Sequence, residues 1–299
     1  MKLTFHSKNI LIIGIDSFTG KHLKSYLEKY DFKVYGTSIS VSKNDNIFQC
    51  DITKKDNIKK VINDIRPHYI VNLAAISFVG TKNKELFYKV NVIAVENILE
   101  SILEIDGYHP IKIILISSAT VYGNQDSDVL DETMTPNPVN HYGISKLAME
   151  QIAKTFFGKL NIIITRPFNY TGIAQSENFL IPKIVSHYKD KKEFIELGNI
   201  NVFREFNDVN YLCEAYRRLL ESEVKSELVN IASNRIIALK NVIEDMNRIA
   251  GYEIEIRVNP VFVRKNEIIM LSGSPDKLFS LVKNIEQKKF TETLNNMYV

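Results

Sequence analysis

The first half of this 299-residue chain alternates short apolar runs with longer segments of helical periodicity. The runs at 10–13, 69–71 and 111–116 are rich in isoleucine. In the segment 56–65, isoleucine and valine recur at the three- and four-residue spacing of one helix face. Short buried strands that alternate with helices predict an α/β fold with a doubly wound parallel sheet. The predicted strands are 10–13, 33–35, 47–48, 69–71, 111–116 and 161–164, and the predicted helices are 18–30, 56–65, 84–104 and 141–157.

The second half of the chain has a looser rhythm, which begins after Arg166-Pro167. Helical patterns occur at 178–187, 209–220 and 239–249, and the strand candidates among them, such as 227–231, are short. We therefore expect a smaller mixed α/β cap at the carboxyl edge of the sheet. No linker rich in glycine and proline separates the halves, so we expect one shared cleft. The expected first domain is 1–165 with 208–235 returning to it, and the expected cap is 166–207 with 236–299.

The composition argues against several classes of protein. With 45% hydrophobic and 24% charged residues, the chain is typical of a soluble globular protein. Its formal net charge is +3 and the two signs are interspersed, so neither nucleic acid nor a membrane is an expected partner. Two cysteines give no disulfide framework, and neither has a metal-type spacing, so no metal is expected. No signal peptide or long apolar run is present, so we expect a cytoplasmic protein.

Three polar residues form the most informative chemical pattern of the chain. Tyr142 and Lys146 stand four positions apart in a predicted helix, and Ser118 closes a predicted strand. A tyrosine phenol has a pKa of about 10, and an ammonium one helical turn away is expected to lower it. A serine hydroxyl could bond the same carbonyl oxygen. The three residues predict a centre that moves hydrogen between a carbon–oxygen bond and a cofactor. The alternatives are an ordinary helix pair and a serine that caps a turn.

A glycine turn follows the first predicted strand and opens the first helix. Gly14 and Gly20 hold the outer positions of a G-x-x-G-x-x-G pattern, and a serine replaces its central glycine. In this context, backbone N–H groups can approach a pyrophosphate. Simple turn chemistry is the alternative. The expected cofactor contacts in this turn are Gly14, Ser17, Phe18, Thr19 and Gly20.

The end of the second predicted strand bears on the choice of cofactor. NAD-preferring sheets often carry an acidic residue there, which bonds the ribose hydroxyls. Here the position is held by Ser38, with Lys43 nearby. Hydroxyls and a lysine suit a 2′-phosphate better, so the sequence favours NADP(H), with NAD(H) as the alternative. An ordinary polar loop is also consistent with this segment.

Two later strand ends complete the expected cofactor groove. Asp51 and Ile52 could bond the adenine edge, although an acid at a helix N-terminus is the alternative for Asp51. The small residues after the strand 69–71 would let the backbone pass close to the cofactor, and Tyr142 and Lys146 would contact its nicotinamide end. The expected contacts after that strand are Leu73, Ala74 and Ala75.

In combination, these motifs resemble the extended short-chain dehydrogenases/reductases of the nucleotide-sugar epimerase/dehydratase type. The resemblance covers nearly the whole chain and implies a Rossmann sheet that binds a dinucleotide, with a cap that binds the sugar nucleotide. The segments that carry it, in chain order, are 14–20, Asp51, 72–75, 117–123, 142–146, a loop over the active site at 131–138, a sugar-nucleotide loop at 166–172, a later signature at 204–209, and Arg264 with Glu267. By this resemblance the substrate contacts are Ser77, Asn169, Lys183, Arg204 and Arg264.

Within that family, segments 75–79 and 166–169 with Gln175 are most similar to reductases of 4-keto-6-deoxy sugars linked to GDP or dTDP. The resemblance implies reduction of a C4 ketone, with the hydride from nicotinamide and the proton from Tyr142. Related dehydratases need an acid just after the catalytic serine, where this chain has Ala119, Thr120 and Val121, so dehydration is not expected. A 4-epimerase and a non-catalytic NADP-binding sensor remain alternatives. Homodimers through the helices 84–104 and 141–157 are common in the family, so a homodimer is expected.

Overall fold

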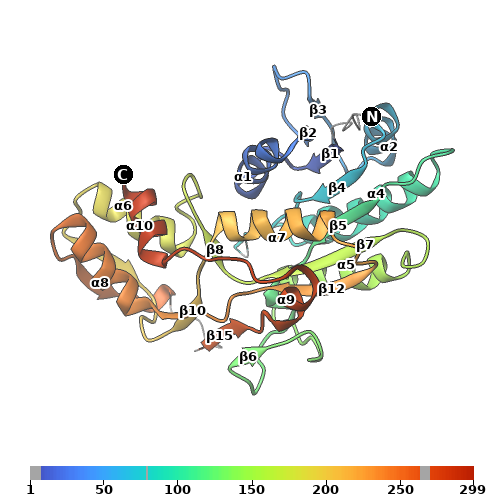
Figure 1. Ribbon diagram of the computed structural model, residues 1–299. Helices are drawn as coiled ribbons and strands as arrows, with labels where there is room; N and C mark the ends of the chain where they lie inside the picture. The colour runs from blue at the N-terminus through green and yellow to red at the C-terminus, as the bar shows by residue number, and fades with distance from the viewer. Residues whose placement is uncertain (1–7, 79, 263–269) are drawn as a thin grey trace.

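Among the residues that the computed structural model describes (8–78, 80–262 and 270–299), seven strands form one parallel sheet (Figure 1). This confirms the predicted doubly wound α/β fold. The order across the sheet is β12-β7-β5-β4-β1-β2-β3. The strands are β1 Lys8–Ile13, β2 Phe32–Ser38, β3 Ile47–Gln49, β4 Tyr69–Asn72, β5 Lys112–Ile116, β7 Ile162–Pro167 and β12 Glu227–Ile231.

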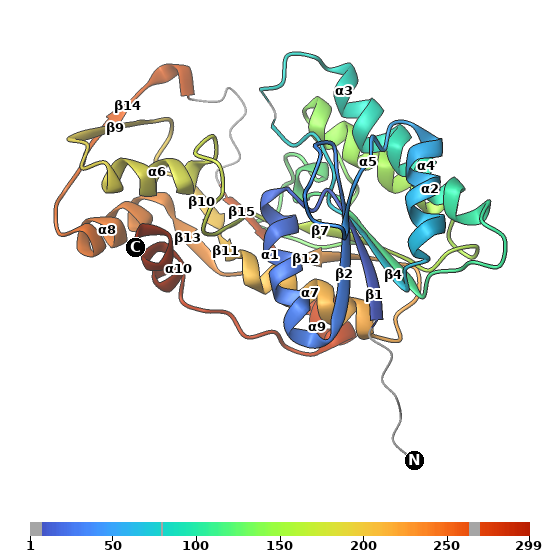
Figure 2. The same cartoon turned by 90° about the horizontal axis from the view of Figure 1, so that it is seen from above.

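Helices cover both faces of the sheet, as Figure 2 shows. Side chains that alternate along each strand feed two separate cores, for example Ile10 and Ile12 into one and Leu11 and Ile13 into the other. One face is covered by α1 Phe18–Leu27, α7 Val209–Glu221 and α9 Asp276–Val282. The other is covered by α2 Lys55–Ile65, α4 Ala94–Leu103 and α5 His141–Lys154.

The strands end in register at the carboxyl edge of the sheet. Ile13 of β1 lies opposite Thr37 of β2 and Asn72 of β4. Ile116 of β5 lies opposite Thr165 of β7. The turns that follow these strands therefore meet along one edge, which is where open α/β sheets bind their ligands.

The predicted helix 84–104 is interrupted by one π-helical turn. It consists of α3 Glu85–Tyr88, the π turn Lys89–Ile93 and α4. Asn91 lies in the π turn and is fully buried. Its side chain accepts from the backbone N–H of Ile76 (2.8 Å) and donates to the carbonyl oxygen of Ile76 (3.0 Å) and to Ser145 Oγ (3.0 Å). Asn91 therefore ties the loop after β4 to α5, which is the structural hydrogen-bonding role that its place in a helix suggests.

The cap lies beside the carboxyl edge and has a core of its own. Its helices are α6 Leu180–Lys189, α8 Leu239–Ala250 and α10 Phe290–Tyr298. Its strands are β9 Phe194–Leu197 with β14 Glu255–Val258, and β10 Phe203–Glu205 between β13 Ile236–Ala238 and β15 Met270–Gly273. β15 also pairs with β6 Val129–Leu130, and the short strands β8 Tyr170–Thr171 and β11 Asn207–Asp208 pair with each other.

Late segments of the chain lie with the seven-stranded sheet. β12 is its edge strand beside β7, and α7 packs against α1. Leu278 and Val282 of α9, and Ile285 after it, belong to the same core as α1 and α7. The segment 236–299 was expected to belong wholly to the cap. In the structure, the part around α9 packs on the first domain instead, because the chain returns to that domain after β15 and enters the cap again at α10.

A buried carboxylate joins the cap to the end of β12. Glu205 of β10 is fully buried, and its oxygens accept hydrogen bonds from two residues just beyond β12, Ser233 and Asn234. They also accept from Asn207 Nδ2 (2.7 Å) and from the backbone N–H of Gly273 (3.1 Å). Burial raises the pKa of Glu205, and the hydrogen bonds oppose that rise.

Replacing Glu205 with glutamine should destabilise the protein, because an amide nitrogen would then face N–H and O–H donors that need an acceptor. We expect the free energy of unfolding in urea to fall by about 1–3 kcal/mol. The exposed control Glu292→Gln on α10 should stay within about 0.5 kcal/mol of the parent. Equal stability of the two variants would contradict this role for Glu205.

Candidate functional site

Helix α5 presents the two predicted catalytic residues to the end of β5. The helix begins after Asn140, whose Oδ1 accepts from the backbone N–H of Gly143 (2.9 Å). Lys146 is 4% exposed, and its Nζ donates to the carbonyl oxygen of Ile116 (2.7 Å). Burial lowers the pKa of Lys146 to about 8, while the charge of Glu150 one turn further along opposes the drop. Lys146 is thus held at the last residue of β5.

The hydroxyl of Ser118 is directed by its own turn. Its Oγ accepts from the backbone N–H of Thr120 (3.2 Å) and from Thr120 Oγ1 (3.0 Å). Because the Ser118 oxygen accepts these two hydrogen bonds, its hydroxyl hydrogen can be donated to another oxygen, such as that of the Tyr142 phenol. Burial raises the pKa of the Tyr142 phenol, and the neighbouring Ser118 hydroxyl lowers it by less. The structure therefore brings Ser118 and Tyr142 together as the sequence predicts.

The predicted lowering of the Tyr142 pKa is wrong in this structure. Burial raises that pKa to about 12 in spite of the opposing effect of the Ser118 hydroxyl. The Lys146 ammonium, which was expected to stabilise the phenolate, is bound to the Ile116 carbonyl oxygen. A phenol with a raised pKa keeps its proton at neutral pH, which is the state needed to donate that proton to a carbonyl oxygen.

A buried ion pair lies one turn beyond Lys146 on the same helix. Glu150 is fully buried, and it binds Arg166 of β7 through two hydrogen bonds, from Nε (2.9 Å) and Nη2 (2.7 Å). Ser117 Oγ of the β5 end also donates to Glu150 (2.5 Å), and the guanidinium lies 4.6 Å from the ring centroid of Tyr122. The pair fastens α5 to β5 and β7. Arg166 opens the segment that the sequence assigns to sugar-nucleotide contact, but its own side chain points into this pair.

The turn after β1 has the close backbone approach that a dinucleotide cradle needs. Gly14 has φ +80°, and a Cβ there would lie 2.9 Å from the backbone nitrogen of Ala74. A Cβ on Gly20 would lie 2.5 Å from the carbonyl oxygen of Gly14. Ser17 caps α1, since its Oγ accepts from the backbone N–H of Gly20 (3.0 Å). The residues present therefore fit a bound dinucleotide, with Ser17 shaping the turn.

Tyr170, which was not predicted individually, lies against this turn. Its hydroxyl shares a hydrogen bond with Thr19 Oγ1 (2.8 Å), and its ring stacks on Phe18 with centroids 6.1 Å apart. The first turn of α1 thus contacts β8, the strand that follows the loop after β7. Only the fold brings these distant segments together, so residue spacing gave no signal for this contact.

The other expected cofactor contacts lie on turns at the same edge. Leu73 continues from β4, and its N–H donates to the carbonyl oxygen of Ile13 (2.9 Å). Ala74 N–H donates to Asn72 Oδ1 (3.2 Å). Asp51 Oδ1 accepts from the N–H (3.0 Å) and hydroxyl (2.7 Å) of Thr53, which lower the pKa of that carboxyl. These bonds give Asp51 a turn-forming role just before α2, as in the alternative interpretation. Ala75 is partly exposed on the loop after β4, and Ile52 is buried beside Asp51.

The end of β2 carries an acid that the sequence argument overlooked. Ser38 Oγ donates to Asp16 Oδ2 (2.7 Å) and accepts from the backbone N–H of Ser40 (3.0 Å). Asp16 belongs to the glycine turn, and the parallel pairing of β1 with β2 brings it beside Ser38. The premise that no carboxylate lies at this strand end is therefore wrong.

The predicted substrate contacts lie on separate elements. Asn169 is exposed between β7 and β8, and Ser77 is exposed on the loop after β4. Lys183 of α6 donates to the carbonyl oxygen of Glu196 (2.7 Å), so its ammonium is engaged within the cap. Arg204 of β10 donates to the carbonyl oxygen of Phe203 (2.9 Å). Arg264 and Glu267 lie outside the described residues.

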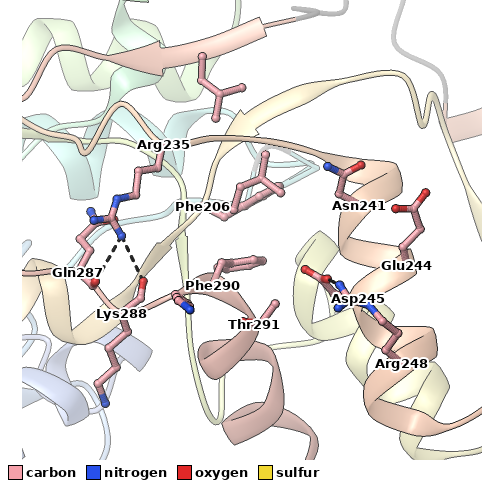
Figure 3. Close-up of a pocket in the computed structure, with 13 residues that line it drawn as sticks. Phe206, Arg235, Asn241, Glu244, Asp245, Arg248, Gln287, Lys288, Phe290 and Thr291 are labelled. Carbon is pink, nitrogen blue, oxygen red and sulfur yellow. Dashed lines mark hydrogen bonds and ion pairs between the residues drawn. The ribbon is translucent and has the colours of Figure 1, made fainter.

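A pocket of about 460 Å³ lies on the cap (Figure 3). Phe206 and Phe290 stack on each other in its lining, and Arg235 donates to the carbonyl oxygens of Gln287 and Lys288. Its lining contains none of the predicted site residues.

Known proteins resemble the chain along nearly its whole length. The sequence pattern of the family described as GDP-mannose 4,6 dehydratase matches residues 11–297. The GDP-6-deoxy-D-talose 4-dehydrogenase of Aggregatibacter actinomycetemcomitans is 35% identical over 276 residues, which cover 92% of this chain and 91% of that protein. The GDP-6-deoxy-D-mannose reductase of Pseudomonas aeruginosa is 26% identical over 283 residues, covering 91% and 90%.

Solved structures share the fold. A crystal structure from Burkholderia cenocepacia, provisionally named an epimerase, is 37% identical with a TM-score of 0.91, over 98% of this chain and 97% of that one. The structure of RMD from Pseudomonas aeruginosa with NADPH is 24% identical with a TM-score of 0.84, over 97% of each chain. None of the helices in the described parts of this chain is long and apolar enough to cross a bilayer.

Removing one partner of the buried ion pair should be costly, because it leaves Arg166 charged and buried without its carboxylate. We expect Glu150→Ala to lower the free energy of unfolding in urea by about 3–5 kcal/mol. The double variant Glu150→Leu with Arg166→Met should recover much of that loss.

The control for this experiment is Glu100→Ala, which removes an ion pair with Lys55 at the surface (2.7 Å). Exposed pairs contribute under about 1 kcal/mol, so this variant should remain close to the parent. If Glu150→Ala costs no more than Glu100→Ala, the ion pair does not hold α5 in place.

Proposed function

The chain belongs to the GDP-mannose 4,6 dehydratase family of nucleotide-sugar short-chain dehydrogenases/reductases, and from this premise we propose that it reduces the C4 ketone of a nucleotide-diphosphate 4-keto-6-deoxyhexose. The observation that carries the proposal is the convergence of Ser118, Tyr142 and Lys146 at the end of β5. The coarser conclusion is an NAD(P)-dependent oxidoreductase that acts on nucleotide sugars.

The names of the relatives support position 4 of a 6-deoxy sugar. The Aggregatibacter enzyme is named GDP-6-deoxy-D-talose 4-dehydrogenase, and the Pseudomonas enzyme is named GDP-6-deoxy-D-mannose reductase. Talose and mannose differ in configuration at C4, so a 4-ketone is the species that oxidation of the one and reduction to the other would have in common. Both names contain GDP, so we propose a GDP-linked substrate, with dTDP as the alternative that the sequence also allows.

The residues of the cradle fit a nicotinamide dinucleotide. Gly14 and Gly20 provide the close backbone approach, Ala74 lies beside Gly14, and Thr19 lies in the first turn of α1. When bound, the reduced cofactor supplies the hydride for the ketone carbon. The sequence favours NADP(H) and allows NAD(H), and this choice depends on the residues at the end of β2.

The side chains at the β5 end would perform the proton chemistry. Tyr142 holds its proton at neutral pH and would give it to the ketone oxygen as that oxygen gains charge. Ser118 would donate a hydrogen bond to the same oxygen and fix its position. Lys146 would turn its ammonium from the Ile116 carbonyl oxygen to the cofactor ribose.

Three residues argue against dehydration despite the family's name. The dehydratases of this family use an acid just after the catalytic serine. Here Ala119 and Val121 are buried in a small apolar core, and Thr120 bonds back to Ser118. A 4-epimerase is the second candidate, because epimerases are among the structural neighbours and share the same fold. A non-catalytic NADP-binding sensor is the third candidate, and the assay must distinguish it from the reductase and the epimerase.

The direct assay mixes the protein with NADH or NADPH and a GDP- or dTDP-linked 4-keto-6-deoxyhexose. We expect the absorbance of the reduced nicotinamide to fall with one of the ketones. Interconversion of a UDP- or GDP-hexose with no net change in absorbance would favour an epimerase. Binding of the dinucleotide with no conversion of any sugar would favour a sensor and contradict the proposal.

Tyr142→Phe removes one hydroxyl and with it the proton donor. We expect turnover to fall by a factor of about 100 or more, because general acid catalysis contributes that much, while dinucleotide affinity changes little. Affinity is measured by calorimetry and turnover by absorbance. Tyr252→Phe in the cap is the matched control and should keep full turnover. Parallel loss of affinity and turnover would mean that Tyr142 is structural.

We also propose a homodimer through the two helices named by the resemblance. Leu86 of α3, Ile93 of the π turn and Ile144 of α5 are 36%, 49% and 41% exposed, so both helices present large apolar side chains at the surface. Tyr88 and His141 connect the two helices by a hydrogen bond (2.9 Å). An apolar surface formed by both helices could pair with its own copy around a two-fold axis.

Light scattering after size-exclusion chromatography tests the dimer. We expect the parent to have the mass of two chains, and Ile144→Glu to have the mass of one, because a charge would enter the apolar interface. Val41→Glu is the control on a distant exposed side chain (79% exposed) and should leave the mass unchanged. A monomeric parent, or an Ile144→Glu variant that remains dimeric, would contradict this interface.

A further inference from the structure

The turn after β1 is fastened to the end of β2 by several contacts. The backbone N–H groups of Gly14 and Ile15 both donate to the carbonyl oxygen of Thr37 (3.1 and 3.0 Å). Gly36 has no side chain, and a Cβ there would lie 2.4 Å from the Ile15 side chain, so Ile15 packs directly on β2. The residue after Ile15 is Asp16, whose backbone is therefore fixed beside the last residues of β2.

The Asp16 carboxylate also uses the hydroxyl that was expected to meet a 2′-phosphate. Ser38 is buried, and its only hydroxyl hydrogen goes to Asp16 Oδ2 (2.7 Å). The N–H of Ser40 is directed to Ser38 Oγ (3.0 Å). Asp16 itself is exposed, so its carboxylate faces the solvent side of the groove. A phosphate at this strand end would therefore meet the Asp16 carboxylate, a hydrogen-bond acceptor, and not the Ser38 hydroxyl as a donor.

The charges on the neighbouring loop do not compensate for this acid. The connection 39–46 between β2 and β3 carries one lysine, Lys43, and one acid, Asp45. Both are exposed, and their formal charges cancel. The next element along the sheet, β3, has no charged side chain, since it reads Ile-Phe-Gln. The local formal charge is therefore set by Asp16.

We infer that Asp16 makes this site select NAD(H) over NADP(H). In doubly wound sheets the adenosine ribose lies at the end of the second strand, where an acidic residue accepts hydrogen bonds from its hydroxyls. Here the acid comes from the glycine turn and reaches the same place through Ser38. It repels a 2′-phosphate, which carries a charge of about −2. The inference rests on the proposed function and reverses the cofactor preference drawn from the sequence.

Calorimetric titration of the purified full chain with NADH and with NADPH tests the inference without any sugar substrate. We expect the parent to bind NADH at least about tenfold more tightly than NADPH. The preference should shrink as salt is added, because Asp16 is exposed and its repulsion is screened.

Asp16→Asn is the informative variant, since its amide oxygen can still accept from Ser38 while the charge is lost. We expect NADPH affinity to rise by about tenfold and NADH affinity to change by less than about threefold. Asp190→Asn is the matched control: it removes the same charge from an exposed position at the end of α6, and should leave the ratio of affinities unchanged.

Two results would overturn the inference: a parent that binds NADPH as tightly as NADH, or an Asp16→Asn variant that folds and keeps the parent's ratio. Circular dichroism reports folding, and if the variant does not fold, the parent's ratio alone decides. A parent that binds neither dinucleotide would overturn the proposed function, and the inference with it. Tight NADH binding without sugar turnover would support the inference while contradicting the proposed reduction.

Discussion

The reaction centre depends on one buried ion pair, Glu150 with Arg166. Two charges removed from water are costly unless each meets its partner in good geometry, and here both guanidinium–carboxylate bonds are short. Because Glu150 also accepts from Ser117, the pair fixes the register of α5 against the end of β5. That register decides where Tyr142 lies relative to Ser118, so the proposed proton transfer depends on a contact that touches neither substrate nor cofactor.

The carboxyl edge of the sheet assembles the rest of the site in the same way. Aligned strand ends bring the turns after β1, β2, β4 and β5 to one edge of the sheet. The glycine turn provides close approach, and its Asp16 reaches the end of β2. Thr19 then meets Tyr170, which connects the cradle to the loop that leads into the cap. Cofactor and sugar would therefore be positioned by one continuous set of contacts.

Much of the fold followed from short-range pattern, because buried strands and amphipathic helices leave a local signature. The four-residue spacing of Tyr142 and Lys146 likewise predicts a shared helix face, and Glu150 continues that spacing, so it could have been found. Asp16 could not, since its closeness to Ser38 arises only from the pairing of β1 with β2. The raised pKa of Tyr142 was not predicted for a similar reason. Burial depends on the packed structure, whereas the expected effect of Lys146 on that pKa was inferred from residue spacing alone. The return of α9 to the first domain also depends on long-range packing.

The central claim is that a hydride reaches the sugar's C4 while Tyr142 protonates the oxygen on that carbon. It is tested most directly by running the reaction with a reduced cofactor that carries deuterium on the transferred position of its nicotinamide. The account predicts one deuterium on C4 of the product hexose, seen by mass spectrometry and located by NMR. A converted sugar without that deuterium, or with deuterium on another carbon, would contradict it.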